Sequence, residues 1–223
     1  MLRRILHELK EHVPFTMLGA VSGIALMLLI IIARVGPKTL EPAFEGFHAA
    51  HVLLSAIVIA GLFHRYRGNA VQAVLVAFVG SVGIATLSDV IFPHEGGILL
   101  LKLIGKQHAM DFHLPIVEEP WLIAPAALIG IAIGIWKHKT KVSHSGHILV
   151  STWASLFYLV AHAEGQVNWW PLLPLVLVVL FVSVWVPCCF SDIVFPLLFL
   201  GEEAADEHHH GHDDEHEHTD AGS

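Results

Sequence analysis

The chain has 223 residues, of which 55% are hydrophobic and only 14% are Asp, Glu, Lys or Arg. Because a soluble domain of this size carries about 25% charged residues, this composition argues against an ordinary soluble protein. The net charge of -8, with no basic stripe interleaved with aromatic residues, argues against a nucleic-acid partner, and 18 histidines against 12 Lys plus Arg point to metal or proton chemistry.

Six apolar stretches approach the roughly 20 residues that a helix needs to cross a bilayer. The predicted spans are 14–34, 47–64, 70–92, 120–136, 147–163 and 171–198. The first is too long for a cleavable signal, and four prolines predict that the last is kinked or broken. The third is expected to end near Pro93, with 98–104 lying along the interface as a short amphipathic segment.

The basic residues predict an orientation for these spans. With the amino terminus inside, eight Lys or Arg fall on inner segments and four on outer ones. We therefore expect an integral protein of a prokaryotic cytoplasmic membrane with both termini in the cytoplasm.

Two motifs occur twice in the same order. His48-Ala-Ala-His51-Val-Leu-Leu-Ser55 returns 96 residues later as His144-Ser-Gly-His147-Ile-Leu-Val-Ser151. Ser88-Asp89-Val-Ile-Phe92-Pro93 returns after 103 residues as Ser191-Asp192-Ile-Val-Phe195-Pro196. A weaker match relates Pro14, Gly19 and Gly23 to Pro125, Gly130 and Gly134, as G-x-x-x-G pairs that pack helices within one chain or between two copies.

Such ordered matches predict an all-α membrane protein of six transmembrane helices, built as two inverted three-helix repeats (3+3). An odd number of crossings turns the second unit upside down, as in many secondary transporters. The expected organisation is a first repeat at 1–93, an extracytoplasmic linker at 94–118, a second repeat at 119–200 and a tail at 201–223. The tail contains nine acidic residues and six histidines without Lys or Arg, so we expect it to be disordered.

Histidines three residues apart share one face of a helix, so two imidazoles can approach one ion. With a carboxylate from a neighbouring helix they form a His/His/Asp site suited to zinc, iron, cobalt, nickel or manganese. The two repeats would place one half-site near each face, unless broken helices draw them toward the midplane. The predicted metal ligands are His48, His51, Asp89 and His94 in one half-site and His144, His147 and Asp192 in the other, with Ser88 and Ser191 orienting the aspartates.

Two further groups carry ligand-type side chains. Candidate relay residues flank the predicted spans: His7, Glu11, His12, Asp111, His113, Glu118 and Glu119. The tail histidines are expected to bind divalent cations weakly and in multiples: His208, His209, His210, His212, His216 and His218. Solvated loop polarity or interfacial positions are the simpler explanation for many of these residues.

The leading functional prediction is a transporter for a divalent transition-metal cation, with alternating access between the repeats and protonation of the site available for coupling. The expected partners are the bilayer, metal ions and a second copy of the chain. One alternative is a membrane-embedded zinc hydrolase, although neither H-E-x-x-H nor G-x-S-x-G occurs. Another is a metal-sensing membrane subunit without transport, in which metal binding is confined to the tail.

Overall fold

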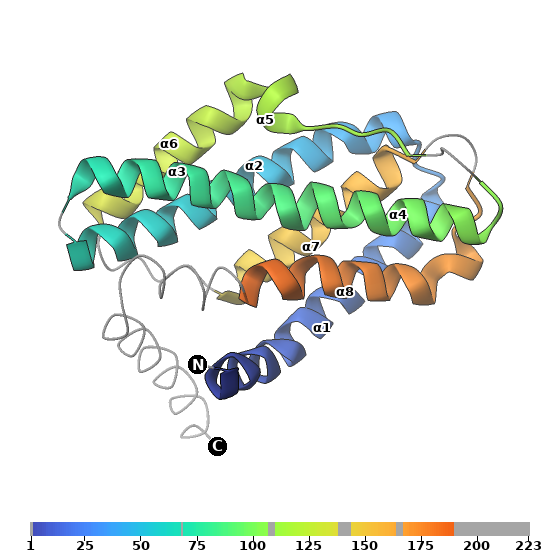
Figure 1. Cartoon of the computed structure of the whole chain (residues 1–223). Helices are drawn as coiled ribbons and strands as arrows, with labels where there is room; N and C mark the ends of the chain where they lie inside the picture. Colours follow the sequence, from blue (N-terminus) through green and yellow to red (C-terminus); the bar gives the residue numbers. More distant parts are fainter. Residues whose placement is uncertain (1, 68, 107–109, 138–143, 164–166, 190–223) are drawn as a thin grey trace, which may run out of the picture.

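The computed structural model describes residues 2–67, 69–106, 110–137, 144–163 and 167–189. Over these residues the chain is a bundle of helices without a strand, and an isolated bridge joins Met110 to Ala163 (Figure 1). The elements are α1 (Leu2–Ala33), α2 (Pro37–Arg67), α3 (Ala70–Thr86), the π-helical turn η1 (Leu87–Ile91), α4 (Phe92–Leu103), α5 (Pro115–Glu118), α6 (Pro120–Trp136), α7 (His144–Ala161), the 3-10 turn η2 (Trp170–Leu172) and α8 (Leu173–Cys189).

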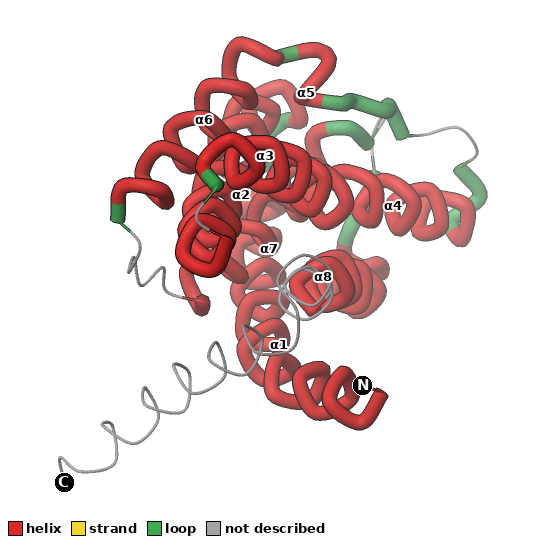
Figure 2. Tube along the Cα trace, turned by 60° about the vertical axis from the view of Figure 1, so that its left-hand side comes forward, coloured by secondary structure: helices red, strands yellow, loops and turns green. Residues whose placement is uncertain are grey.

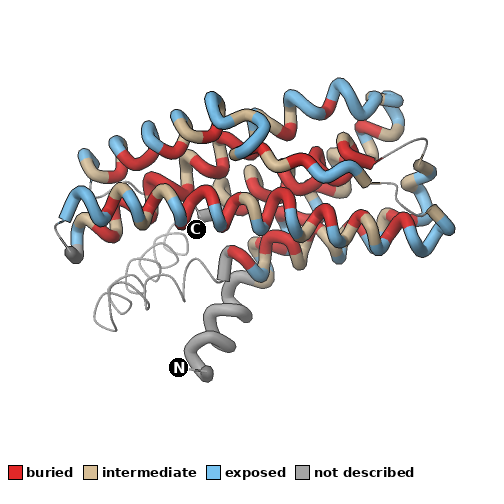
Figure 3. Tube along the Cα trace, turned by 45° about the horizontal axis from the view of Figure 1, so that its top comes forward, coloured by how far each residue is buried: buried red, intermediate tan, exposed pale blue. Residues whose placement is uncertain are grey.

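Four helical segments of the described chain are long and apolar enough to cross a membrane. These are Val13–Ala33, Pro37–Arg65, Ala70–Leu103 and Trp170–Pro187, and two shorter apolar helices cover Pro120–Trp136 and Gly146–Ala161. Large apolar side chains such as Leu18, Val71 and Trp136 are exposed, and the outward faces of the helices carry much of the exposed surface (Figure 3). An apolar exterior on long helices is the pattern of an integral membrane protein.

The helix of the third predicted span does not end at Pro93, and residues 98–103, expected to form a separate short segment, continue it. Instead α3, η1 and α4 follow one another without a break from Ala70 to Leu103 (Figure 1). A proline interrupts a helix because it lacks an N–H donor. Here Pro93 follows a π turn, in which each N–H bonds to the carbonyl five residues earlier, as the Phe92 N–H does to Leu87 O. In this pattern the Ser88 carbonyl would accept from residue 93, which as a proline has no N–H. The Ser155 hydroxyl lies 2.9 Å from this carbonyl and can donate in place of the missing N–H.

The last predicted span is one unbroken helix over Leu173–Cys189. Helix α8 continues through Pro187 to Cys189, so that proline does not break it. Residues 190–198 lie outside the described residues, and so does the tail predicted to be disordered.

Helix α2 lies at the centre of the packing. It packs against α3, α6 and α7, while α1 packs against α7 and α8 (Figure 2). Phe44 contacts Tyr158 and His51 contacts His147, so α2 and α7 run in opposite directions. The start of α2 therefore lies beside the end of α7.

The paired glycines bring helices close together within the chain. A Cβ at Gly19 would lie 2.9 Å from the Thr152 hydroxyl of α7. A Cβ at Gly130 or Gly134 would overlap the backbone carbonyl of Leu53 or Ile57 in α2. Only glycine allows the α6 backbone to approach the α2 backbone this closely.

Candidate functional site

A buried carboxylate organises the centre of the bundle. Asp89 Oδ2 accepts hydrogen bonds from His48 Nδ1 at 3.0 Å and from His51 Nδ1 at 2.7 Å. Its Oδ1 accepts from the hydroxyls of Ser88 at 2.7 Å and Ser151 at 2.9 Å. All five side chains are at most 1% exposed. We call this group the central site.

Local structure positions each of these groups. His48 and His51 are three residues apart on α2, so both imidazoles face the same side of that helix. Asp89 lies in the π turn, where an extra residue per turn re-aims side chains and is frequently associated with function. Ser151 reaches the same carboxylate from α7, so the site joins three separate segments of the chain.

The four bonds occupy the whole acceptor capacity of an ionised carboxylate, which has about four lone-pair directions. They offset the cost of burying this charge, which for a carboxylate at the centre of a membrane-spanning helix is roughly 2.5–3.5 kcal/mol on insertion scales. Because a carboxylate only accepts, each imidazole donates its Nδ1–H to Asp89. The Nε2 lone pairs of His48 and His51 are thereby left free, and both atoms are buried without a hydrogen-bond partner.

The second copy of the histidine motif lies next to the first. The rings of His51 and His147 are 4.7 Å apart, and Ser55 Oγ lies 3.1 Å from His147 Nε2. Thus the serine of each motif contacts a residue of the other predicted repeat: Ser55 contacts His147, and Ser151 donates to Asp89. The motifs meet inside the bundle rather than at opposite faces.

His94, predicted as a ligand of the first half-site, does not join the central site. It lies on α4 with its Nδ1 3.4 Å from the Tyr158 hydroxyl and its ring 5.0 Å from that of Phe112. Across the described residues, no three His, Cys, Asp or Glu side chains surround a common metal position. Metal binding at His48, His51 and Asp89 stays a prediction.

Several predicted residues fall where no geometry is described. Asp192, Ser191 and all six tail histidines lie outside the described residues. The side chains of His7, Glu11, His12 and His144 are likewise outside the described set, although the backbones of these residues are helical in α1 and α7.

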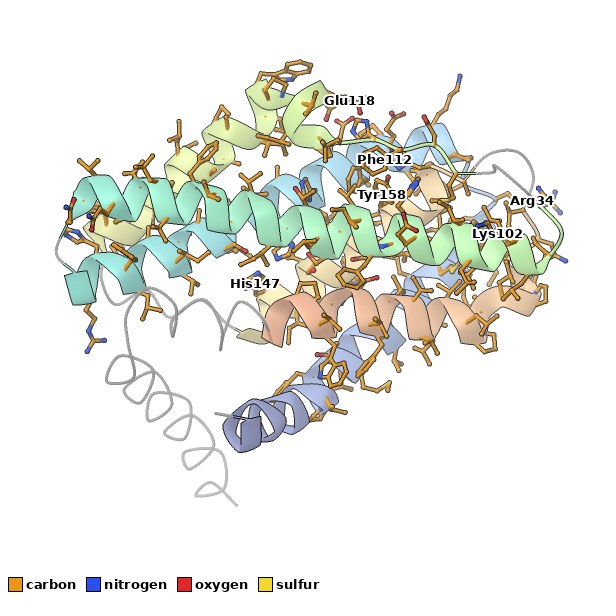
Figure 4. The ribbon with its side chains drawn as sticks, in the orientation of Figure 1. Arg34, Lys102, Phe112, Glu118, His147 and Tyr158 are labelled. Carbon is orange, nitrogen blue, oxygen red and sulfur yellow. The ribbon has the colours of Figure 1, made fainter. Side chains whose placement is uncertain are left out.

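The candidate relay residues after α4 gather at the end of the bundle away from His147, where Glu118, Phe112 and Tyr158 lie (Figure 4). His113 Nδ1 donates to Glu118 Oε2 at 3.0 Å, and its backbone N–H donates to the Tyr158 hydroxyl at 3.3 Å. The Leu114 N–H donates to Glu118 Oε1 at 2.8 Å, and this bond, together with His113, holds the pKa of Glu118 below 4.5.

Further ionisable groups from α2 and α7 join this end of the bundle. Glu119 is half-buried near Glu45 of α2, and the ring of His113 stacks on that of His162 at 5.1 Å. Asp111 contributes its backbone N–H to the His162 carbonyl. We call the ionisable residues here the loop cluster: Glu41, Glu45, Asp111, His113, Glu118, Glu119 and His162.

Phe44 separates the loop cluster from the central site. Its side chain is completely buried and stacks on His48 at 5.5 Å. On its other sides it makes edge contacts with His113 at 6.0 Å, Tyr158 at 5.1 Å and His162 at 5.5 Å. An apolar ring therefore lies between two groups of polar side chains.

Comparisons with known proteins leave the site to be interpreted from its chemistry. The chain matches no protein-family model, no curated protein and no solved structure.

Sequence reasoning missed several members of these two groups. Ser55 and Ser151 belong to the repeated motif, so their identical positions in the two copies were an available signal. His162, which follows the last residue of α7, stacks on His113. Phe44 and Glu45 carry no signal of their own, because apolar and acidic residues near the start of a span are common.

Proposed function

We propose that this protein is a membrane transporter for a divalent transition-metal cation and that His48 and His51 bind the transported ion through Nε2. The single observation that carries this proposal is the pairing of both Nδ1 atoms with one carboxylate while both Nε2 atoms are buried and unpartnered. A histidine that binds a metal through one ring nitrogen characteristically donates the other N–H to a carboxylate. In this arrangement Asp89 orients the ligands and offsets the charge of the ion.

A buried acceptor without a partner is costly, so its presence at two neighbouring rings favours a ligand-binding role. Imidazole nitrogen suits zinc, copper, iron and nickel better than magnesium or calcium, which take oxygen ligands. We therefore keep the cargo class expected from the sequence, zinc, iron, cobalt, nickel or manganese, within which the imidazole ligands favour zinc, iron and nickel. His147, whose ring lies 4.7 Å from that of His51, is the nearest candidate for a further ligand.

We further propose that the fold consists of two inverted repeats of three helices, with six spans and both termini in the cytoplasm. Reciprocal packing supports this proposal. Gly19 meets Ile148 and Thr152 of α7, and Gly130 meets Leu53 and Ala56 of α2. Thr152 lies 96 residues after Ala56, which is the offset of the repeated histidine motif, and Gly130 lies 111 residues after Gly19, which is the offset of the repeated glycine pairs. The glycine of each proposed repeat therefore packs against the same position of the other.

Such an arrangement suits alternating access. The rings of His51 and His147, which are counterparts in the repeat, would lie near the pseudo-two-fold axis. Rocking of one repeat against the other would then expose this region first to one side of the membrane and then to the other. The acidic, histidine-rich tail would concentrate the cation on the cytoplasmic side.

The test is cation flux into proteoliposomes that contain the full chain and an entrapped Zn²⁺-sensitive dye. His48→Asn and His51→Asn keep an N–H donor near the position of Nδ1 but delete Nε2, so both are expected to reduce flux at least about tenfold. His64→Asn, farther along the same helix, is the matched control and is expected to leave flux unchanged.

Circular dichroism and gel filtration establish that each variant folds before flux is compared. If wild-type vesicles carry no more Zn²⁺, Co²⁺ or Mn²⁺ than empty vesicles, the transport proposal is wrong. If both Asn variants transport like wild type, the transported ion does not bind at these histidines.

A further inference from the structure

A second pair of imidazoles lies in the loop cluster, apart from the proposed cation site. The rings of His113 and His162 are nearly parallel, with centroids 5.1 Å apart and an interplanar angle of 18°. His113 precedes α5 and His162 follows the last residue of α7, so the two rings come from segments far apart in the sequence. Each residue is only 7% exposed. The fold therefore buries two neighbouring histidines at this end of the bundle.

Hydrogen bonds determine which nitrogen of each ring carries the proton. His113 Nδ1 lies 3.0 Å from Glu118 Oε2, and His162 Nδ1 lies 3.1 Å from the backbone carbonyl oxygen of Tyr158. Because an ionised carboxylate and a carbonyl only accept hydrogen bonds, each ring donates its Nδ1–H. A neutral imidazole has one donor and one acceptor nitrogen, so the Nε2 atom of each ring has a free lone pair.

Both Nε2 atoms lack a partner. Each is buried and, among the described residues, makes no hydrogen bond. The two rings cannot satisfy one another, because neither has a hydrogen left to donate from Nε2. Buried acceptors without a partner are costly, so two of them on adjacent rings favour a bound cation.

The hydrogen bonds of this pair match those of metal-binding histidines. A histidine that binds a metal through one nitrogen characteristically donates its other N–H to a carboxylate or a backbone carbonyl. Glu118 provides a carboxylate for His113, and Tyr158 provides a carbonyl for His162. The same pattern holds His48 and His51 in the central site.

The spacing of the rings also suits a shared ion. An ion of the zinc class lies about 2.0–2.1 Å from a ligating imidazole nitrogen, so two imidazoles at a near-tetrahedral angle have centroids about 5 Å apart. The centroids of His113 and His162 are 5.1 Å apart. Within the described ranges no third His, Cys, Asp or Glu completes a common metal position, so water would fill the remaining coordination positions. Such a site releases its ion more readily than a closed site of four protein ligands.

The charges around the pair favour a cation. Glu118 is bonded to His113, and Glu41 and Asp111 act on His162 as negative charges. Calcium and magnesium prefer oxygen ligands, whereas imidazole nitrogen suits zinc, iron, nickel and copper. The two Nε2 lone pairs therefore favour a transition metal.

We propose that His113 and His162 bind a divalent transition-metal cation through Nε2, at a second site that we call the loop site. Phe44 makes edge contacts with both rings and stacks on His48, so one aromatic ring separates the loop site from the central site. The loop site would load the cation before it passes Phe44. The loop site stands on the histidine pair itself, whereas its role in loading rests on the proposed transport function.

The experiment is equilibrium dialysis of the full chain in lipid nanodiscs against micromolar Co²⁺, with bound cobalt counted by atomic emission. His113→Asn and His162→Asn keep an N–H donor near the position of Nδ1 but delete Nε2, so each is expected to bind one Co²⁺ fewer than wild type. The tail is the same in every sample, so its contribution cancels. Circular dichroism and gel filtration establish that each variant folds.

His94→Asn is the matched control. His94 is also buried and also approaches Tyr158, but its Nδ1 faces the Tyr158 hydroxyl at 3.4 Å and its ring does not belong to the pair. This variant is expected to bind as much Co²⁺ as wild type. The proposal is overturned if either His113→Asn or His162→Asn binds as many ions as wild type.

A second measurement leaves the loop site unaltered, so it remains decisive even if those variants do not fold. In the double variant His48→Asn/His51→Asn, Co²⁺ is expected to shift the isotope-labelled methyl resonance of Met110, whose backbone bridges to Ala163 beside His162. The methyl group of Met17, two residues from Gly19 and thus beside the first half of α7, should shift much less. Equal shifts, or none, would reject the loop site.

Flux measured on the same proteins separates the loop site from the transport proposal. Loss of one Co²⁺ in His113→Asn and His162→Asn, without flux in wild type, would retain the loop site and reject transport. Normal flux with an unchanged Co²⁺ count in either variant would reject the loop site and leave His48 and His51 as the cation ligands. If the loop site loads the carrier, both variants should raise the Zn²⁺ concentration for half-maximal flux and leave the maximal flux unchanged; the reverse result would reject the loading role.

Discussion

Replacing Ser151 with alanine isolates the contribution of α7 to the central site. The Ser151 hydroxyl is completely buried and donates to Asp89 Oδ1 at 2.9 Å, and alanine removes that donor without adding volume. Hydrogen bonds to charged groups contribute about 1.5–3 kcal/mol. We therefore expect Ser151→Ala to lower the free energy of unfolding by about this amount, which is roughly a 10- to 150-fold change in the unfolding equilibrium.

Ser81→Ala provides the matched control. Ser81 is also completely buried, but its hydroxyl donates to the Phe78 carbonyl of its own helix at 3.3 Å. This substitution is expected to change the free energy of unfolding by less than about 0.5 kcal/mol. Equilibrium unfolding in mixed micelles, followed by tryptophan fluorescence, measures both variants. Equal stabilities of Ser151→Ala and Ser81→Ala would refute the assignment of Ser151 as a donor to a buried carboxylate.

Three other predictions concern the close contact of α2 with α6, the Phe44 ring between the loop cluster and the central site, and the pH dependence of stability at Glu118. In Gly134→Ala the new Cβ would overlap the Ile57 carbonyl, so this substitution should lower the free energy of unfolding by about 1–3 kcal/mol. The control is Gly83→Ala, whose Cβ meets nothing within 4 Å and should not destabilise the protein. A similar melting temperature for both variants would contradict the close approach of α2 and α6. Phe44 is completely buried, so Phe44→Ala should lower the free energy of unfolding by about 3–5 kcal/mol, measured in a denaturant titration, and Phe44→Leu should lower it distinctly less. Equal losses of stability in the two variants would show that the volume of the ring is unimportant. Because the pKa of Glu118 is lowered in the folded state, its ionised side chain should stabilise the protein fully above about pH 4.5, and this stabilisation should be lost as the pH falls through the folded-state pKa. The difference in free energy of unfolding between wild type and Glu118→Gln should therefore shrink on acidification. Growth of that difference would contradict the direction of the pKa shift.

The sequence was most informative where local geometry decides the outcome. The spacing of His48 and His51 places both on one face of any helix, and their repetition beside Ser88 and Asp89 identified the residues that meet in the central site. Apolar stretches likewise predicted where the helices lie. These features depend on periodicity along one segment, which is readable without knowledge of the neighbours.

Other features depend on contacts between distant segments and were beyond such reasoning. A proline at position 93 ordinarily predicts the end of a helix, but a π turn and the hydroxyl of Ser155, 67 residues away, allow the helix to continue. The nearness of Glu45 to Glu119 similarly depends on where α2 lies relative to the start of α6. His94 was placed with Asp89 because the two are close in sequence, whereas the course of α4 carries it to Tyr158.

The π turn also determines which neighbours the long α3–α4 helix can have. One additional residue in a turn rotates everything that follows by about 100° around the helix axis. The α3 part faces α2 and α6, whereas beyond the turn Gly96 meets Val179 of α8 and Gly97 meets Leu159 of α7. One long helix thus has contact faces in two different directions, and deleting one residue from the turn would restore ordinary α-helical pairing there but direct the second half of the helix at the wrong partners.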